Sequence, residues 1–192
     1  MAKRVFFSFH YQDVIDFRAN VVRNHWLTKK DREDAGFFDA SIWEEAKKKG
    51  NLSLKRLING GLKNTSTTCV LVGSDTFNRK WVNYEIMKSV SIGNHILAVH
   101  INSIKGKDKK TKTKGPNPLY YLGYSFSKDG KTVNLYDYID KKWIKYTDLD
   151  SYSVKEVDEK YRNKIYRLSS DYNIYDWNDD DGYDNFSDWV NG

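Results

Sequence analysis

The sequence predicts an α/β protein whose core is a parallel sheet covered by helices on both faces. Short apolar runs and amphipathic segments alternate over residues 5–101, which is the order of strands and helices in a doubly wound sheet of about four strands. The apolar runs are continuous, as expected for strands covered on both faces. Beyond residue 118 the pattern changes to alternating aromatic and polar residues. We therefore expect a flavodoxin-like core followed by a β-hairpin-rich C-terminal extension.

The strands and helices of the core are predicted from hydrophobic spacing and from the residues that end each run. Strands are expected at 5–9, at 35–41 with its end at Asp39, at 69–72 before Gly73, and at 95–101. Val14, Phe17 and Val21 predict a helix after the first strand. Leu54, Leu57 and Ile58 predict another over 53–59, closed by Gly60-Gly61 as left-handed caps.

The helix predicted over 79–91 places a carboxylate at the edge of the core. Val82, Ile86 and Val90 are four residues apart and share its buried face. At roughly 100° per residue, Glu85 falls about 100° from the centre of this stripe. A glutamate on a helix is most often a solvated residue paired with a neighbouring cation. The alternative is a ligand site, because open α/β sheets bind ligands where strand ends and helix starts converge.

Composition limits the class of protein. The chain has 192 residues, enough for one domain with a buried core, and its 15% aromatic content argues against disorder. The single cysteine, Cys69, lies in a predicted core strand, which excludes an internal disulfide and a Cys-based metal site. No apolar stretch is long enough for a signal peptide or a membrane span. We expect a soluble, cytoplasmic protein that makes no membrane contact.

We expect one domain over 1–192, in three parts. These are an α/β core over 1–104, a Lys-rich loop over 105–118 and a β-rich and helical extension over 119–192. In the extension, Asp129-Gly130 predicts a hairpin, the charged segment 155–167 predicts a helix, and the last residues predict a short amphipathic turn that contains Phe186, Trp189 and Val190.

Motifs for several common reactions are missing from the sequence. It contains no Gly-x-x-x-x-Gly-Lys phosphate loop and no Gly-x-Gly-x-x-Gly after the first strand, which disfavours ATP hydrolysis and ordinary hydride transfer. The histidines are scattered and the acidic run 179–181 lacks the alternation of a calcium loop, so we expect no metal. The net charge of +6 is concentrated in the lysine run 105–114. Such a run favours a solvated, mobile loop, and nucleic-acid binding is only a weak alternative.

The carboxyl ends of the first three predicted strands bring together a crevice rich in aromatic rings. Its residues are 7–11, 39–43 and 73–77, together with Trp81, Tyr84 and Glu85. Rings stack on a flat base and a carboxylate complements positive charge. The crevice therefore suits a flat, partly cationic ligand such as nicotinamide or adenine.

Five motifs in order resemble the Toll/interleukin-1 receptor (TIR) like proteins of the bacterial Thoeris anti-phage system, the ThsB family. The likeness extends over nearly the whole chain. The motifs are Arg4-Val5-Phe6-Phe7-Ser8-Phe9-His10-Tyr11-Gln12-Asp13, Phe38-Asp39-Ala40-Ser41, the run 73–89, Lys114-Gly115-Pro116-Asn117-Pro118, and Tyr175-Asp176-Trp177 with Asp180-Asp181-Gly182-Tyr183.

The resemblance implies a TIR-like fold and cleavage of NAD+ between nicotinamide and ribose, with NAD+ as a substrate and no bound cofactor. The ADP-ribose part would be cyclised into a soluble signal that activates the partner effector ThsA. The catalytic glutamate of the family matches Glu85, the residue that helical geometry also singles out. Phe6, Phe7, Trp81 and Tyr84 are expected to form the walls of the cleft.

Two further residues are open to two interpretations each. Ser8 would contact the ribose or a phosphate, or it is a simple residue at a strand end, and Asp39 is a second polar contact or the cap of the next segment. A phage protein as trigger and assembly of several copies would fit such a sensor. The alternative function is a non-catalytic TIR-type adaptor, which needs no carboxylate beside an aromatic crevice.

Overall fold

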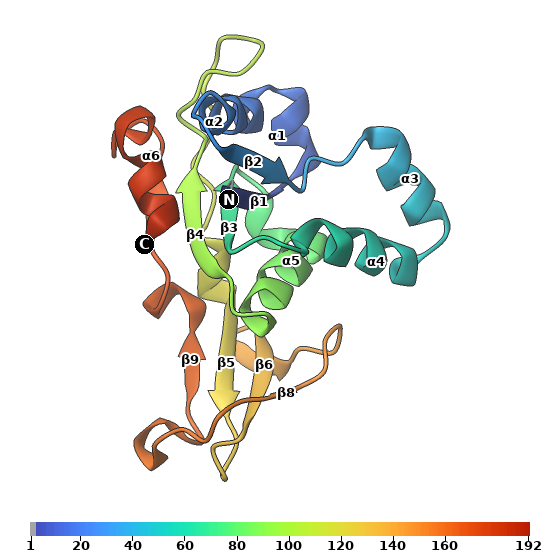
Figure 1. Ribbon diagram of the computed structural model, residues 1–192, viewed down its shortest axis with the longest axis vertical. Helices are drawn as coiled ribbons and strands as arrows, with labels where there is room; N and C mark the ends of the chain where they lie inside the picture. Colours follow the sequence, from blue (N-terminus) through green and yellow to red (C-terminus); the bar gives the residue numbers. More distant parts are fainter. Residues whose placement is uncertain (1–2) are drawn as a thin grey trace.

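The predicted parallel sheet is present, with five strands. The computed structural model describes residues 3–192, and Figure 1 shows the sheet with helices on both faces and a second sheet beyond its lower end. The strand order is β10-β4-β3-β1-β2, with all neighbours parallel. Because β3 lies on the side of β1 away from β2, the winding direction reverses there, which confirms the flavodoxin-like order. The strands are β1 (Lys3–Phe9), β2 (Arg32–Ala35), β3 (Thr67–Val72), β4 (His95–His100) and β10 (Ile174–Asp176).

Helices cover both faces of this sheet. The helices α1, α2 and α6 pack on one face, around Trp26, Trp177 and Phe186, and α4 and α5 pack on the other. All six residues of β3 are buried between the two layers, as predicted for the run that contains Cys69. The helices are α1 (Tyr11–Ile15), α2 (Arg18–Leu27), α3 (Ala40–Lys48), α4 (Asn51–Leu62), α5 (Lys80–Ser91) and α6 (Gly182–Asn191). No helix within residues 3–192 is both long and apolar enough to cross a membrane.

The strand predicted over 35–41 is displaced toward the N-terminus, with only one residue in common with β2. As an edge strand, β2 pairs with β1 alone, so its polar sequence carries no hydrophobic signal. Gly36 follows it with φ +92° and ends the strand. Phe38 has left the sheet and stacks on Trp43 of α3, with ring centroids 6.1 Å apart. The apolar residues that suggested a strand therefore belong to a loop and a helix start.

The predicted left-handed caps at Gly60-Gly61 are wrong, because both glycines lie inside α4. A Cβ on Gly61 would lie 2.8 Å from Phe38 Cζ and 3.0 Å from Phe6 Cε2. Gly61 therefore lets α4 approach two aromatic rings closely. Around Gly60 no atom of the described chain lies within 4 Å of such a Cβ, apart from its chain neighbours and the backbone of its own helix, so this glycine has no comparable packing reason.

Alanine at these two neighbouring positions should have opposite effects on stability. We expect Gly61→Ala to lower the free energy of unfolding by about 1–3 kcal/mol, because the added methyl overpacks the two rings. Gly60→Ala, its matched control, should raise it by about 0.5–1 kcal/mol through helix propensity. Urea unfolding followed by circular dichroism measures both. Equal effects of the two substitutions would contradict the packing role of Gly61.

The C-terminal extension is an antiparallel sheet that packs against α5. Its order is β7-β6-β5-β9, and β8 pairs with β6. The predicted hairpin at Asp129-Gly130 is confirmed, with Gly130 at φ +73° between β5 and β6. Leu122 and Leu135 of this sheet share one apolar cluster with Val82 and Ile86 of α5. The strands are β5 (Leu122–Phe126), β6 (Thr132–Ile139), β7 (Lys142–Lys145), β8 (Tyr152–Ser153) and β9 (Ile165–Arg167).

Two other expectations for the C-terminal part have different outcomes. The helix predicted over 155–167 is wrong, because a short 3₁₀ turn at Glu159–Tyr161 is followed by β9, which hydrogen-bonds to β5. The amphipathic end of the chain is confirmed as α6, which buries Phe186 and Val190. Strand β10 comes from this same part, and the sequence pattern misses it because it is three residues long and follows the antiparallel sheet. Other 3₁₀ turns lie at Thr76–Asn78, Pro118–Tyr121 and Leu168–Ser170.

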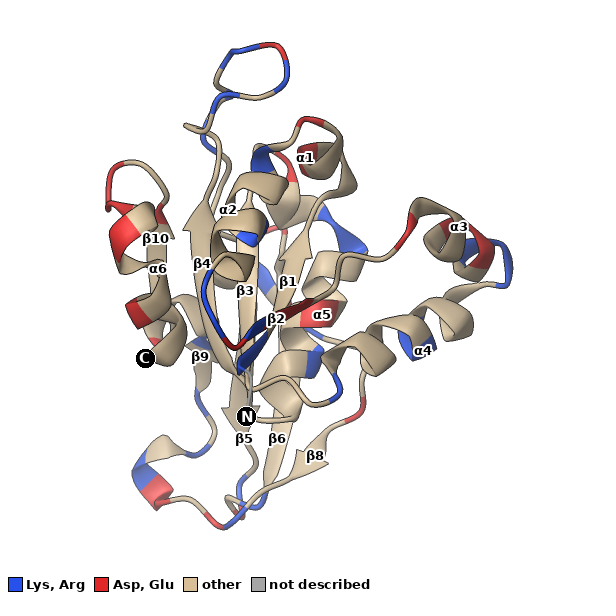
Figure 2. Cartoon of the chain, turned by 45° about the horizontal axis from the view of Figure 1, so that its top comes forward, with Lys and Arg blue, Asp and Glu red and all other residues tan. Residues whose placement is uncertain are grey.

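The lysine run 105–114 is a loop, as predicted, but it is anchored to the body. The helix predicted after β1 breaks at Phe17, with φ 66°, and α2 then begins with the buried Arg18. Arg18 donates to the carbonyl oxygens of Ile104 at 3.0 Å and Lys110 at 2.6 Å. Figure 2 shows the basic residues of the loop projecting beyond the other elements. The loop is therefore held at its base while its tip stays in solvent.

Candidate active site

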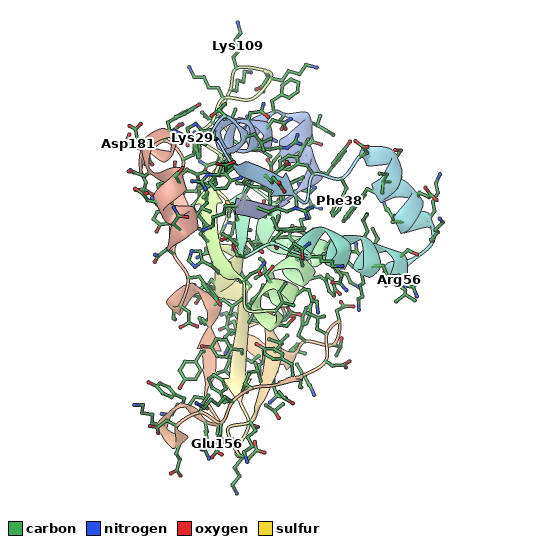
Figure 3. All side chains as sticks on the ribbon, in the orientation of Figure 1. Lys29, Phe38, Arg56, Lys109, Glu156 and Asp181 are labelled. Carbon is green, nitrogen blue, oxygen red and sulfur yellow. The ribbon has the colours of Figure 1, made fainter. Side chains whose placement is uncertain are left out.

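A cavity of about 520 Å³ opens at the carboxyl ends of β1 and β2, beside the start of α5. Its volume is typical of small-molecule sites, and its position is the edge at which open α/β sheets bind ligands. Phe38, labelled in Figure 3 between α3 and the sheet, is one of the rings in its wall. The lining residues are Phe7, Phe9, His10, Tyr11, Gly36, Phe38, Ala40, Trp43, Glu44, Lys47, Asn78, Arg79, Lys80, Trp81, Val82 and Glu85.

Glu85 is the acidic residue at the buried end of this cavity. It belongs to α5, is only 6% exposed and still contributes to the lining. Ser8, fully buried on β1, donates its hydroxyl hydrogen to Glu85 Oε2 at 2.5 Å. Because β1 and α5 are both packed into the core, this hydrogen bond fixes the carboxyl group relative to the sheet.

Burial raises the pKa of Glu85 to about 8, although the hydrogen bond from Ser8 acts in the opposite direction. At neutral pH the carboxyl group of Glu85 is therefore mostly protonated. A cationic ligand beside it would lower this pKa and favour the carboxylate. Burial and the charge of Arg79 lower the pKa of His10, which also lines the cavity, and so favour the neutral imidazole. Glu85 is therefore the buried carboxyl group of the lining whose ionisation a positively charged ligand would change.

The mouth of the cavity carries cations at the start of α5. Arg79 occupies the N-cap position and Lys80 is the first helical residue, and both line the cavity. Arg79 Nε is buried without a hydrogen-bond partner in the described part of the chain. Its ion pair with Asp75, at 3.4 Å, is largely exposed and therefore weak. Backbone N–H groups at a helix start also attract anions, so this mouth suits a phosphate group.

Three of the residues predicted from the sequence line the cavity, and four do not. Phe7, Trp81 and Glu85 are in its wall. Ser8 lies behind the wall, where it holds Glu85. Asp39 is exposed at the N-cap of α3, outside the lining set, and its side chain makes no capping hydrogen bond to the described residues.

Phe6 and Tyr84 must be corrected as wall residues. Both are buried in the cluster that joins the sheet to α4, together with Ile58 and other apolar side chains. Tyr84 donates its hydroxyl hydrogen to Asn59 Oδ1 at 3.2 Å, so its polar end points to α4. The side chains support the helices around the cavity but do not form its surface.

The cations at the mouth were missed, although the sequence contains a signal for them. Arg79 and Lys80 lie at the start of a helix, where the macrodipole favours acidic residues. The preceding sequence supplies no Ser, Thr or Asp cap for α5. Residues that destabilise a helix start, without a compensating contact in the fold, are expected at functional sites.

Comparisons with known proteins identify the family of this chain. The family model described as "Thoeris protein ThsB, TIR-like domain" matches residues 6–106. A relative from Bacillus cereus (strain MSX-D12), named "Putative cyclic ADP-D-ribose synthase ThsB1", is 62% identical over 192 residues, which is 100% of this chain and 100% of the relative. The chain belongs to the ThsB family. The matched ThsB region contains the last four residues of β1, all of α5 and every residue that lines the cavity, whereas the antiparallel sheet follows it in the chain.

Proposed function

We propose that this ThsB-family protein cleaves NAD+ at the bond between nicotinamide and ribose and joins the ADP-ribose part into a cyclic signalling molecule. The name of the Bacillus cereus relative indicates the reaction class for that protein. The observation that carries the proposal for this chain is Glu85, buried at the end of an aromatic cavity with a cationic mouth. NAD+ is the substrate here, and we propose no resident cofactor.

The charges of the cavity match those of NAD+ in order. The pyridinium of nicotinamide is cationic and would lie beside Glu85, against the rings of Phe7 and Trp81. The pyrophosphate is anionic and would lie at Arg79 and Lys80. Binding of the pyridinium lowers the pKa of Glu85, so that the substrate itself generates the carboxylate.

Cleavage then needs little more than charge stabilisation. As the bond between C1′ and the nicotinamide nitrogen breaks, its electron pair leaves with neutral nicotinamide and the ribose becomes oxocarbenium-like. The Glu85 carboxylate stabilises this positive charge at short range in a desolvated site. A hydroxyl group or ring nitrogen of the same ADP-ribose then bonds to C1′, and a proton that it releases passes to Glu85. Cyclisation is faster than hydrolysis when that group is held close to C1′ and water is excluded from the cavity.

The diffusible product would act on the effector ThsA, and a phage component would start the reaction. Self-assembly would complete the site if residues are shared between copies. The decisive test expresses the protein in cells, challenges them with phage and applies the filtered lysate to purified ThsA. Activation of ThsA by wild-type lysate and not by Glu85→Gln lysate supports the enzyme. Defence that survives without such a small molecule would instead identify the protein as a TIR-type adaptor.

Removal of the guanidinium at the mouth should weaken substrate binding more than chemistry. We expect Arg79→Ala to raise the KM for NAD+ by about ten- to hundredfold, the usual cost of losing a hydrogen bond to a charged group. The kcat should change little, because Arg79 contacts the phosphate end. Lys88→Ala, which removes a cation at the other end of α5, is the matched control. An unchanged KM in Arg79→Ala would place the pyrophosphate elsewhere.

A further inference from the structure

The C-terminal extension contacts the start of α5 through the carboxylate of Asp148. Asp148 lies in the segment between β7 and β8, and its two oxygens pair with two lysines of the α/β core. Oδ1 lies 3.0 Å from Lys55 Nζ of α4, and Oδ2 lies 3.4 Å from Lys80 Nζ of α5. A residue of the extension thus connects to a cation that lines the cavity.

Asp148 is held in place from more than one side. Lys55 also donates to its backbone carbonyl oxygen at 2.7 Å. The next residue, Leu149, packs against the apolar cluster of the antiparallel sheet and against the cluster around Tyr84. Partial burial favours the protonated form of Asp148, but the hydrogen bond and charge of Lys55 and the charge of Lys80 outweigh it and lower its pKa. Asp148 is therefore a fixed anion on a packed segment.

Lys80 depends on this anion for its position. Its side chain is half-exposed and has a flexible four-carbon stem, so an ion pair can decide where its ammonium group lies. With Nζ near Asp148, the ammonium group lies 5.4 Å from the centre of the Trp81 ring. The contact to Asp148 thus directs Lys80 along the same wall that Trp81 forms.

We propose that Asp148 is a positioning residue for NAD+ binding, which aligns Lys80 at the mouth of the cavity to receive the pyrophosphate. The inference rests on the proposed function and extends it, because it makes the antiparallel sheet part of the substrate site. A carboxylate beside a lysine can also act in the opposite way, by neutralising a cation that would attract the phosphate. Alignment predicts weaker NAD+ binding when Asp148 is lost, and neutralisation predicts tighter binding.

The test measures binding and turnover separately in full-length protein. Binding is measured by calorimetry with a carbocyclic NAD+ analogue, whose nicotinamide bond is not cleaved. We expect Asp148→Asn to raise the Kd by about two- to fivefold, the size that a half-exposed ion pair allows. In a Lys80→Ala background the same substitution should have no further effect, because Asp148 acts through Lys80. Asp148→Glu should restore most of the affinity.

A matched control lies in the same C-terminal extension. Glu156 also bridges two cations, Arg162 at 2.9 Å and Lys131 at 3.6 Å, and Figure 3 shows it at the far end of the extension from Phe38. Glu156→Gln should leave the Kd unchanged. A thermal melt of each variant separates a loss of folding from a loss of alignment.

The outcomes decide the two proposals independently. An unchanged or lower Kd in Asp148→Asn, or an effect that persists without Lys80, would overturn the positioning role. If wild-type protein binds the analogue but releases no nicotinamide from NAD+ in phage-challenged cells, the catalytic proposal fails while the role of Asp148 in binding is still decided. If wild-type protein does not bind the analogue, both proposals fall.

Discussion

Glu85→Gln is expected to lower the rate of nicotinamide release by about 100- to 1000-fold, the usual cost of removing one preorganised electrostatic group. The amide has the shape of the carboxyl group and can still accept the hydrogen bond from Ser8, which is 2.5 Å from Oε2. What it cannot supply is a negative charge beside the oxocarbenium-like ribose. Binding of the carbocyclic NAD+ analogue should persist. A variant that keeps wild-type turnover would remove Glu85 from the mechanism.

The same substitution should stabilise the fold at neutral and alkaline pH. Glu85 has an ordinary pKa of 4.5 when unfolded and a pKa of about 8 when buried. The protonated side chain therefore contributes stability that is complete below about pH 4.5 and is lost as the pH rises through about 8. Gln does not titrate, so the variant does not lose this stability as the pH rises. The Tm of Glu85→Gln should exceed that of the wild type by a margin that widens between these two pH values and then stays constant.

Calorimetry across this pH range measures whether Glu85→Gln raises or lowers the Tm relative to the wild type. Ser89→Ala is a useful comparison, since Ser89 is buried one turn further along α5 and bonds to the backbone of Glu85 but not to its carboxyl group. Its Tm difference from the wild type should not widen with pH. A Tm of Glu85→Gln that falls below the wild type as the pH rises would mean that the carboxylate is already satisfied in the folded protein.

Local patterns predicted those parts of the fold in which burial and sequence agree. The run at β3 is apolar because both faces are covered, and the helix spacing of Val82 and Ile86 follows from their contact with the sheet. The patterns failed where pairing decides the structure. Strand β2 is polar because it lies at an edge, and β9 forms because β5 supplies partners for its backbone. Neither fact is contained in the local sequence.

The predictions for the site also succeeded where local sequence decides the position of a residue and failed where distant packing does. The angular position of Glu85 on its helix predicted a carboxylate at the core edge, and the structure places it there. Phe6 was expected in the wall with Phe7, but α4 covers it. That approach depends on Gly61, which comes much later in the chain. Asp148 is further still from α5 in sequence, and only the packing of the second sheet brings it to Lys80.

The pH dependence of turnover should report the ionisation of Glu85 directly. In the free enzyme this group is protonated below about pH 8, and the mechanism needs the carboxylate. The kcat/KM for NAD+ should therefore rise by about tenfold per pH unit below that value and level off above it. The rise in kcat should lie at lower pH, because the bound pyridinium lowers the pKa of Glu85 in the complex.

Ser8→Ala should move this profile without abolishing activity. The hydroxyl group of Ser8 donates to the carboxyl oxygen and lowers the pKa of Glu85 against the effect of burial. Without it the pKa rises further, so the kcat/KM profile should shift to higher pH and approach the wild-type plateau only in alkaline solution. Ser89→Ala should leave the profile in place, since it does not touch the carboxyl group. If Ser8 only fills space, Ser8→Ala should lower the plateau of the kcat/KM profile and leave its midpoint unchanged. If Ser8 adjusts the pKa of Glu85, the midpoint should shift, and this difference distinguishes the two roles.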